Sequence, residues 1–284
     1  MNEDKYATRW RQAAAIDYSL KGRVKSSLRH VALTAMALFG RPFEDRFLRC
    51  LYCHYVFDDL VVQFENMITK LKAIGTFIDT DTCIDMLEGR REIDNKYFHL
   101  SFDDGFRNVF TNAFPVLKQH NVPAIFFVPS SLVNGDWKKA KHYCLDTTRY
   151  PGIIEMVRWD DLAEMVSAGY EIGSHTRNHA RLSNISQDLV LLEAEIVGSK
   201  KDIEERLGIE CKYISWPYGT WADVDKLSLE MVKKAGYHAC FGAFRGSVIP
   251  NKTGLYSIPR HHFELEWPLS HIKFFAKGNL EFSK

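Results

Sequence analysis

Apolar and polar residues alternate along the chain in two rhythms, which predict two kinds of element. Short runs rich in β-branched and aromatic residues predict strands, and stretches in which apolar residues recur every three or four positions predict helices. The predicted strands are 50–56, 97–102, 122–128, 170–174, 211–216, 237–243 and 255–263. The predicted helices are 59–74, 107–120, 159–168, 186–207 and 223–235, the fourth beginning at a Ser186 cap and ending at Gly208.

This alternation of strands and helices predicts an α/β fold with parallel strands. Seven strands and one layer of helices favour a (β/α)7 barrel of the TIM-like type, complete or incomplete, although an open doubly wound sheet uses the same elements. Residues 131–158 form a long polar and aromatic insertion, a kind of loop that is usually functional or mobile. We expect an N-terminal helical extension over 1–47 and the barrel domain over 48–284.

Composition narrows the range of functions. The chain has 284 residues, of which 46% are hydrophobic and 26% charged, with a formal net charge of +1. These values are typical of a globular protein with one large core, and they offer no basic footprint for a nucleic acid. Small molecules or glycans are therefore the expected partners.

The N-terminal residues predict an amphipathic helix and no secretory signal. The opening MNEDKYATRW carries charges of both signs, and 31–39, the longest apolar run near it, is too short to cross a bilayer. Apolar residues within 22–40 follow helical spacing beside the basic KGRVKSSLRH. Such a helix packs on the main domain or makes peripheral contact with a membrane. We expect a cytoplasmic protein with reduced cysteines.

The stretch CLYCHYVFDD contains a C-x-x-C-H pattern, which is the attachment motif of a c-type haem and also a Cys/His cluster that can hold zinc. Cys50 and Cys53 are separated by an odd number of residues, so in a strand they face opposite sides. This spacing disfavours a shared metal or haem. His54 remains a candidate for chemistry, and Asp58 or Asp59 is expected to cap the following helix.

Two further segments place potential metal ligands after predicted strands. HLSFDDGF contains Asp103 and Asp104, adjacent carboxylates that need a nearby cation or a shared proton. EIGSHTRNHARLS contains His175 and His179, which would share one face if the chain were helical there. Two histidines and one carboxylate leave open coordination positions, as a catalytic metal or a non-haem iron oxygenase requires. A plain turn and an exposed histidine pair are the alternative interpretations.

The segment YISWPYGTW follows another predicted strand. Pro217 fixes the backbone, the next glycine permits a tight turn, and Trp216 provides an apolar wall. Such a turn can direct the backbone N–H of Tyr218 at a developing oxyanion, as amide hydrolysis requires.

Together SFDDG, HTRNH in a GSH context, and SWPYG resemble the three motifs of the polysaccharide deacetylases of the NodB-homology type, carbohydrate esterase family 4, over about residues 48–263. The segments VPAIFFVPSSL and RWDDLAEMVSAGYEIGSH extend the resemblance. It implies a distorted barrel, a divalent metal, usually Zn²⁺, and removal of an acetyl group from an N-acetylated sugar.

The resemblance also implies roles for the motif residues. Asp103 is similar to the catalytic base of the family, and Asp104, His175 and His179 are similar to its metal ligands. Zn²⁺, Co²⁺, Ni²⁺ and Fe²⁺ all accept such ligands. The chemistry agrees with this division, because a carboxylate that binds metal accepts protons poorly while its neighbour stays available.

The third motif departs from the family pattern at one position. Many members place an arginine two residues before the proline, where it braces the catalytic aspartate, and this chain has Ser215 there. Arg260 in IPRHHF is the candidate to brace Asp103 from another strand.

Amide hydrolysis also needs a general acid to protonate the departing nitrogen, and histidine is the usual donor near neutral pH. Many family members carry it near the C-terminal end of the domain, which would select His261 or His262. In the subset that resembles the poly-N-acetylglucosamine deacetylases, the strand bearing it comes first, in a Tyr-His context before an acidic pair. CHYVFDD is similar to that permuted arrangement, which favours His54.

The resulting prediction is a metal-dependent N-deacetylase. Its expected substrate is an N-acetylated sugar that is nucleotide-linked, lipid-linked or part of a glycan in cell-surface polysaccharide synthesis. An iron oxygenase with the same two-histidine, one-carboxylate site, a catalytically silent glycan-binding domain and a haem protein are the alternatives.

Overall fold

The computed structural model describes residues 5–13, 28, 31–36 and 43–281. Its strands are β1 Phe47–Cys53, β2 Thr76–Ile78, β3 Lys96–Phe102, β4 Ile125–Val128, β5 Glu171–Ser174, β6 Tyr213–Ser215, β7 Ala239–Phe241 and β8 His261–His262. Its longer helices are α3 Val61–Lys72, α4 Thr80–Leu87, α5 Phe114–His120, α7 Trp159–Ser167, α9 Leu189–Leu207, α10 Lys226–Lys234 and α11 Leu269–Ala276. Short helical segments are α1 Trp10–Ala13, η1 Asp58–Leu60, η2 Val109–Ala113, η3 Ser130–Leu132, α6 Trp137–His142, η4 Tyr143–Thr147 and α8 Leu182–Ile185.

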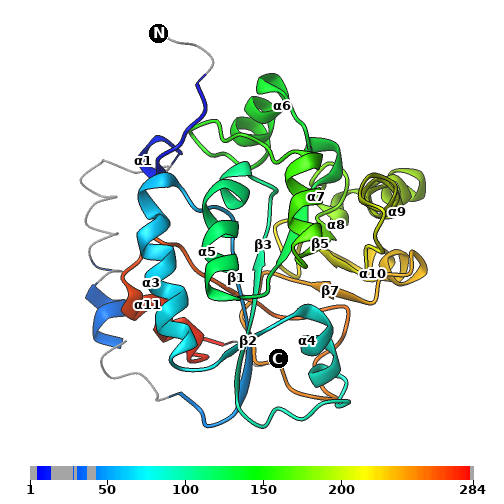
Figure 1. The fold of residues 1–284 in the computed structure, drawn as a ribbon. Helices are drawn as coiled ribbons and strands as arrows, with labels where there is room; N and C mark the ends of the chain where they lie inside the picture. The colour runs from blue at the N-terminus through cyan, green and yellow to red at the C-terminus, as the bar shows by residue number, and fades with distance from the viewer. Residues whose placement is uncertain (1–4, 14–27, 29–30, 37–42, 282–284) are drawn as a thin grey trace.

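The strands form one curled parallel sheet in the order β7-β6-β5-β4-β3-β1-β8. Its two ends are joined, because residues 255–260 exchange backbone hydrogen bonds with β7 and then continue into β8, which pairs with β1. In Figure 1 helices α3, α5, α7, α9 and α10 surround the strands. The predicted α/β fold with a distorted barrel is therefore confirmed, and the open doubly wound sheet is not adopted.

One strand was missed by the sequence patterns. β2 has only three residues, and it pairs with the first half of β3, while β4 pairs with the last two residues of β3. Two short strands thus share one edge of β3. A three-residue strand is too short to show the alternation on which the prediction depends.

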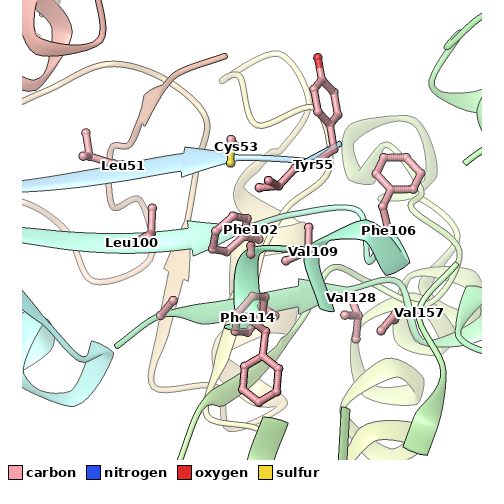
Figure 2. Packing of buried hydrophobic residues seen from close by; sticks show 14 of the residues in the cluster. Leu51, Cys53, Tyr55, Leu100, Phe102, Phe106, Val109, Phe114, Val128 and Val157 are labelled. Atoms are coloured by element: carbon pink, nitrogen blue, oxygen red, sulfur yellow. The ribbon is translucent and has the colours of Figure 1, made fainter. Parts of the chain in front are cut away.

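The outer face of the sheet packs on the helices to form the main core. Leu51 and Cys53 on β1, and Leu100 and Phe102 on β3, point to this side, where they meet Val109 and neighbouring apolar residues of η2 and α5 (Figure 2). Burial of these side chains is the main force that holds strands and helices together, at about 25 cal/mol per Å² of apolar surface.

The inner face of the barrel forms a second apolar cluster. Leu48 and Cys50 on β1 belong to it, together with Ile84 and Leu87 of α4. The helix α4 thus packs its buried side against the inside of the barrel. Cys50 and Cys53 lie in different clusters, so they face opposite sides of β1 as predicted, and this geometry rules out a haem or metal shared by that pair.

Two predicted helix caps are wrong. Asp188, and not Ser186, accepts the capping hydrogen bond of α9 from Leu191 N at 3.0 Å. Neither Asp58 nor Asp59 caps α3. Asp59 Oδ1 instead accepts a hydrogen bond from the backbone of α1, and Asp58 Oδ1 accepts one from Asn112. Both carboxylates therefore connect distant segments, which a local capping rule does not anticipate.

Much of the predicted N-terminal extension, 1–47, and of the predicted amphipathic helix, 22–40, lies outside the described residues. Residues 31–36 are helical, and Thr34 Oγ1 lies 3.0 Å from Nε2 of His271 in α11. No helix within the described part of the chain is long and apolar enough to span a membrane. The domain boundary and the membrane contact stay predictions.

Candidate active site

The candidate site lies where four barrel strands end. His54 follows β1, Asp103 follows β3, His175 follows β5 and Trp216 follows β6, each directly. Backbone hydrogen bonds hold these positions together, such as Asp103 N to Cys53 O at 3.1 Å. Because all the strands are parallel, their carboxyl ends meet at one rim, where barrel enzymes carry their chemistry.

Asp103 is held by a buried arginine. Arg260 Nη1 donates to Asp103 Oδ1 at 2.8 Å, and Nη2 donates to Oδ2 at 2.6 Å. The remaining donors reach Ser101 Oγ, Ser215 Oγ and the carbonyl of Gly242, so the guanidinium is fully hydrogen-bonded although none of it is exposed. The structure thus brings Arg260 to Asp103. Ser215 stands where many family members carry the bracing arginine, and its hydroxyl accepts a hydrogen bond from Arg260.

The arginine also determines the charge of Asp103. Burial alone would raise the pKa of this carboxyl, but the Arg260 guanidinium, followed by His175, lowers the pKa below its ordinary value. The carboxylate is therefore ionised at neutral pH. Each oxygen keeps a second lone pair after bonding Arg260, so Asp103 can still accept a proton.

Three side chains next to Asp103 form a candidate metal centre. The ligand atoms of Asp104, His175 and His179 all lie within 4.8 Å of one another, and the three residues are buried. Asp104 Oδ1 is 3.2 Å from Nε2 of His179 and 3.6 Å from Nε2 of His175. Burial raises the pKa of Asp104, yet the imidazoles of His54, His175 and His179 hold it well below the usual value.

The hydrogen bonds of His175 show that this set fits a cation. Its Nδ1 lies 2.8 Å from the carbonyl of Ser215, which can only accept, so the proton is on Nδ1. In the neutral imidazole Nε2 then presents a lone pair to the carboxylate of Asp104, which is unfavourable unless a cation lies between them. Burial also lowers the pKa of His179, which favours the neutral form that binds metals.

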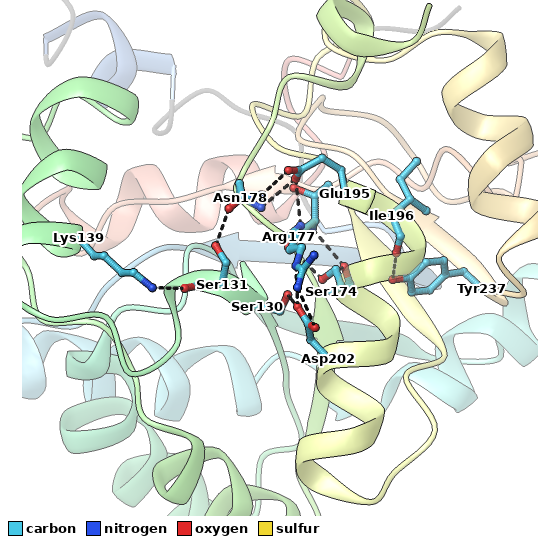
Figure 3. Close-up of polar contacts among 12 residues, drawn as sticks. Ser130, Ser131, Lys139, Ser174, Arg177, Asn178, Glu195, Ile196, Asp202 and Tyr237 are labelled. Carbon is cyan, nitrogen blue, oxygen red and sulfur yellow. Dashed lines mark hydrogen bonds and ion pairs between the residues drawn. The ribbon is translucent and has the colours of Figure 1, made fainter. Parts of the chain in front are cut away.

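The segment HTRNH is a loop and not a helix, which corrects the predicted reason for the pairing of His175 and His179. Thr176 and His179 have positive φ angles of 60° and 59°. Figure 3 shows that Glu195, a buried residue of α9, holds this loop. Its Oε2 accepts hydrogen bonds from the backbone N–H groups of Arg177 and Asn178, at 3.1 and 2.8 Å.

The SWPYG segment forms one wall of the site. Trp216 is buried and donates Nε1–H to Thr220 O at 3.2 Å, and Pro217 lies between it and Tyr218. Tyr218 and Gly219 both have positive φ angles, of 64° and 73°. A Cβ at Gly219 would lie 2.0 Å from that of Ala243, so only glycine fits this turn.

A cavity of about 170 Å³ joins these groups. It is lined by Tyr52, His54, Asp103, Asp104, Thr148, Tyr150, His175, His179, Trp216, Tyr218, Gly219 and Ala243. Pro217 and Arg260 lie outside this lining. The cavity therefore contains the predicted base, the predicted ligands and one candidate general acid.

The three candidate general acids have different surroundings. His54 lines the cavity beside Asp103. The ring of His262 lies 5.1 Å from that of His54 and outside the lining, and its Nε2 is 3.2 Å from Glu264. His261 is buried, with Nε2 3.0 Å from Glu281. The geometry therefore favours His54, with His262 as its neighbour.

The 131–158 insertion contributes residues to the site that the motifs did not indicate. Thr148 and Tyr150 line the cavity, and Tyr143 is buried with its ring 5.3 Å from that of His179. Burial, and then the charge of Asp104, raise the pKa of Tyr143 well above its ordinary value, so it stays a neutral phenol. The aromatic content of the insertion could have indicated a role in the site. The residues that its aromatic side chains contact, such as His179, lie far away in the sequence.

Comparison with known proteins decides the family. The model of the family described as polysaccharide deacetylase matches residues 90–240, which is more than half of the chain. The chain belongs to the polysaccharide deacetylase family. The resemblance inferred from the three motifs is thereby confirmed, and the family to which the chain belongs is one of hydrolases.

The chain is also similar to a curated protein in sequence and to solved structures in fold. The poly-β-1,6-N-acetyl-D-glucosamine N-deacetylase of Staphylococcus aureus (strain MRSA252) is 29% identical over 205 residues, which cover 70% of this chain and 65% of that protein. This match therefore leaves about a third of the relative's length uncovered. The structure of IcaB from Ammonifex degensii, at 22% identity, covers 82% of this chain and 98% of its own with a TM-score of 0.67. The structure of the Streptococcus pyogenes deacetylase PplD in complex with acetate, at 18% identity, covers 82% of this chain and 98% of its own with a TM-score of 0.64.

Replacement of the buried arginine is predicted to destabilise the protein strongly. Arg260→Met should lower the free energy of unfolding by about 3–5 kcal/mol, because it leaves Asp103 buried without its counter-charge. Urea unfolding followed by circular dichroism measures this loss. The double variant Arg260→Met/Asp103→Asn removes both charges and should regain a large part of it. A single variant within about 1 kcal/mol of the parent would show that the pair behaves like a surface ion pair.

Glu195 is predicted to control the order of the loop that carries the two histidines. Glu195→Ala removes the acceptor of two backbone N–H groups, so amide hydrogen exchange in residues 175–181 should accelerate on the order of tenfold or more. Exchange followed by mass spectrometry measures this change. Glu205→Ala, which removes an exposed carboxylate paired with Lys201 on the same helix, is the control. Equal exchange in both variants would exclude the positioning role.

Proposed function

We propose that the protein is a metal-dependent N-deacetylase that hydrolyses the acetamido group of an N-acetylated amino sugar. One observation carries the proposal: the ionised Asp103 lies beside the Asp104, His175 and His179 donor set in a single cavity. Hydrolysis of an amide requires a base for the attacking water, stabilisation of the oxyanion and an acid for the departing nitrogen. The residues of this cavity can supply all three.

The base in this proposal is Asp103. Its carboxylate accepts a proton from the attacking water, while Arg260 holds both oxygens in place. A divalent ion bound by Asp104, His175 and His179, with Zn²⁺ the first choice and Co²⁺, Ni²⁺ or Fe²⁺ as alternatives, would polarise the acetamido carbonyl and lower the pKa of water.

The remaining steps use Tyr218 and His54. The backbone N–H of Tyr218 donates to the oxygen that becomes negative as water adds to the carbonyl carbon. His54 then donates a proton to the sugar nitrogen as the C–N bond breaks. One water is consumed, its oxygen stays on the acetyl carbon, and the products are acetate and a free amine.

The mouth of the cavity supports a glycan as substrate. Tyr218, which lines the cavity, and Trp221, whose ring lies 6.1 Å from that of Trp216, are each 39% exposed, and flat aromatic rings suit the faces of sugar rings. The name of the S. aureus relative makes poly-β-1,6-N-acetylglucosamine the first polymer to test. Nucleotide-linked and lipid-linked N-acetyl sugars are the other candidates.

Acetate release tests the proposed reaction. Zinc-loaded protein should release acetate from at least one of polymeric, nucleotide-linked and lipid-linked N-acetyl sugars without oxygen, and a chelator should abolish the release until Zn²⁺ is restored. Enzymatic quantification of acetate measures it.

Asp103→Asn should bind the same glycan but lose turnover by about two orders of magnitude or more. Dependence on oxygen and iron would favour the oxygenase, and an Asp103→Asn variant equal to the parent in every assay would favour a silent glycan-binding domain.

His54 is predicted to be the general acid. His54→Ala should reduce turnover by about two orders of magnitude or more, because the leaving nitrogen loses its proton donor, while the ion bound by Asp104, His175 and His179 is retained. Acetate release and metal analysis measure the two effects. His262→Ala is the comparison, and its loss should be smaller because His262 lies outside the cavity lining. A larger loss in His262→Ala, or loss of metal in His54→Ala, would overturn the assignment.

A further inference from the structure

A second cluster of potential metal ligands lies inside the barrel, below the active site. Cys50 on β1, Cys83 on α4 and His99 on β3 each offer one ligand atom, and these atoms lie within 4.8 Å of one another. Cys50 and His99 are direct partners in the parallel pairing of β1 and β3. All three residues are at most 1% exposed. The cluster takes no part in the proposed reaction, and it shares only Cys50 with the haem-like C-x-x-C-H pattern, whose other cysteine, Cys53, faces outward.

The distance between the two sulfurs fits a hydrogen bond between thiols and also a metal-bridged pair. Cys50 Sγ and Cys83 Sγ are 3.8 Å apart, and both cysteines are free. A disulfide requires about 2.05 Å, so the pair is not arranged for that bond. Two thiolates bound to one zinc ion at about 2.3 Å, with a tetrahedral angle between them, lie about 3.8 Å apart. The sulfurs could thus bind such an ion without moving.

The hydrogen bonds of His99 leave one nitrogen available as a ligand. Glu171 Oε2 accepts both the backbone N–H of Thr80 and its hydroxyl, at 2.9 and 2.5 Å. With its only proton given to Glu171, Thr80 Oγ1 must accept from Nε2–H of His99, which lies 3.1 Å away. The lone pair is therefore on Nδ1, which is buried and has no hydrogen-bond partner among the described residues.

The same chain of hydrogen bonds is typical of metal-binding histidines. A carboxylate or another acceptor usually fixes the outer N–H of such a ring and thereby its tautomer and orientation. Here Glu171 acts through Thr80, and the ring is further held by stacking on Phe241, with 5.3 Å between centroids. Without a metal, the buried Nδ1 would lose its hydrogen bond to water and gain none in return, which destabilises the fold.

The charges of the cluster also fit a divalent ion. The hydrogen bond from Cys83, followed by His99, holds the pKa of Cys50 below its ordinary value despite burial, while the same hydrogen bond and burial raise the pKa of Cys83 well above its ordinary value. Because the thiolate is the form that binds metals, binding of an ion would release the proton of Cys83. Two thiolates, a neutral imidazole and a dication sum to zero. A neutral centre suits the surrounding inner cluster, which includes Leu48, Ile84 and Phe241.

We propose that Cys50, Cys83 and His99 form a second, buried metal site for a thiophilic ion, with Zn²⁺ as the first ion to test. The ion would fasten α4 to the inner face of β1 and β3 and so close this part of the barrel. Its role is structural, and it does not depend on the proposed deacetylase reaction.

Cobalt spectroscopy distinguishes this site from the active site. Protein produced with Co²⁺ as its metal should show thiolate-to-cobalt charge-transfer absorption in the near ultraviolet, because Asp104, His175 and His179 contain no sulfur. Metal analysis should find two ions per chain in the parent and one in Cys50→Ser/Cys83→Ser, which should also lose the absorption. The variant His175→Ala/His179→Ala should retain one ion per chain, bound by Cys50, Cys83 and His99, and should therefore retain the absorption. Cys211→Ser, a buried cysteine elsewhere in the chain, should match the parent.

The parent protein alone decides the proposal if a variant fails to fold. One ion per chain with no charge-transfer absorption would overturn it. So would a mass two hydrogens lower than that of the six-thiol chain, because the cluster would then be a disulfide. The measurement requires no enzymatic activity, so its failure and the failure of the proposed function can be told apart.

Discussion

The buried ion pair between Arg260 and Asp103 is the constraint on which the rest of the site depends. It joins residues 157 positions apart, and the same guanidinium binds Ser101, Ser215 and the carbonyl of Gly242. A buried charge must be paired and hydrogen-bonded, so β3, β6 and the segment after β7 have to lie in register for the pair to form. The pair also separates the roles of two neighbouring carboxylates, since Asp103 faces the arginine while Asp104 faces the two histidines.

The sequence predicted the features that depend on local patterns. Alternation of side chains located seven of the eight strands, and turn residues after them marked the rim of the barrel. Because the chemistry of a parallel barrel lies at strand ends, His54, Asp103 and His175 could be placed together before any distance was known. Arg260 could be selected for two reasons: it lies in the last predicted strand, and Ser215 replaces the arginine that braces the catalytic aspartate in many family members. The contacts of Arg260 were not derivable from either segment alone.

The features that escaped prediction depend on contacts between distant segments. The histidines of HTRNH have the spacing of a helical pair. The segment is nevertheless a loop with positive φ angles, because Glu195 accepts hydrogen bonds from the backbone N–H groups of Arg177 and Asn178. Asp58 and Asp59 have the pattern of a helix cap, yet their oxygens bind groups from other parts of the fold. In each case a polar side chain has several acceptable partners, and tertiary packing selects one that no local rule identifies.

The inward residues of β3 arrange the barrel interior in layers. His99, Ser101 and Asp103 point inward at successive alternate positions, so His99 lies about 13 Å along the strand from Asp103. Arg260, which bonds Ser101 and Asp103, lies between the thiol cluster and the candidate active site. An unneutralised Cys50 thiolate in the lower layer would attract the same guanidinium that Asp103 requires. A dication bound to Cys50, Cys83 and His99 would cancel that charge and leave the arginine to the carboxylate, so the proposed structural ion would also favour the arrangement of charges on which the proposed chemistry relies.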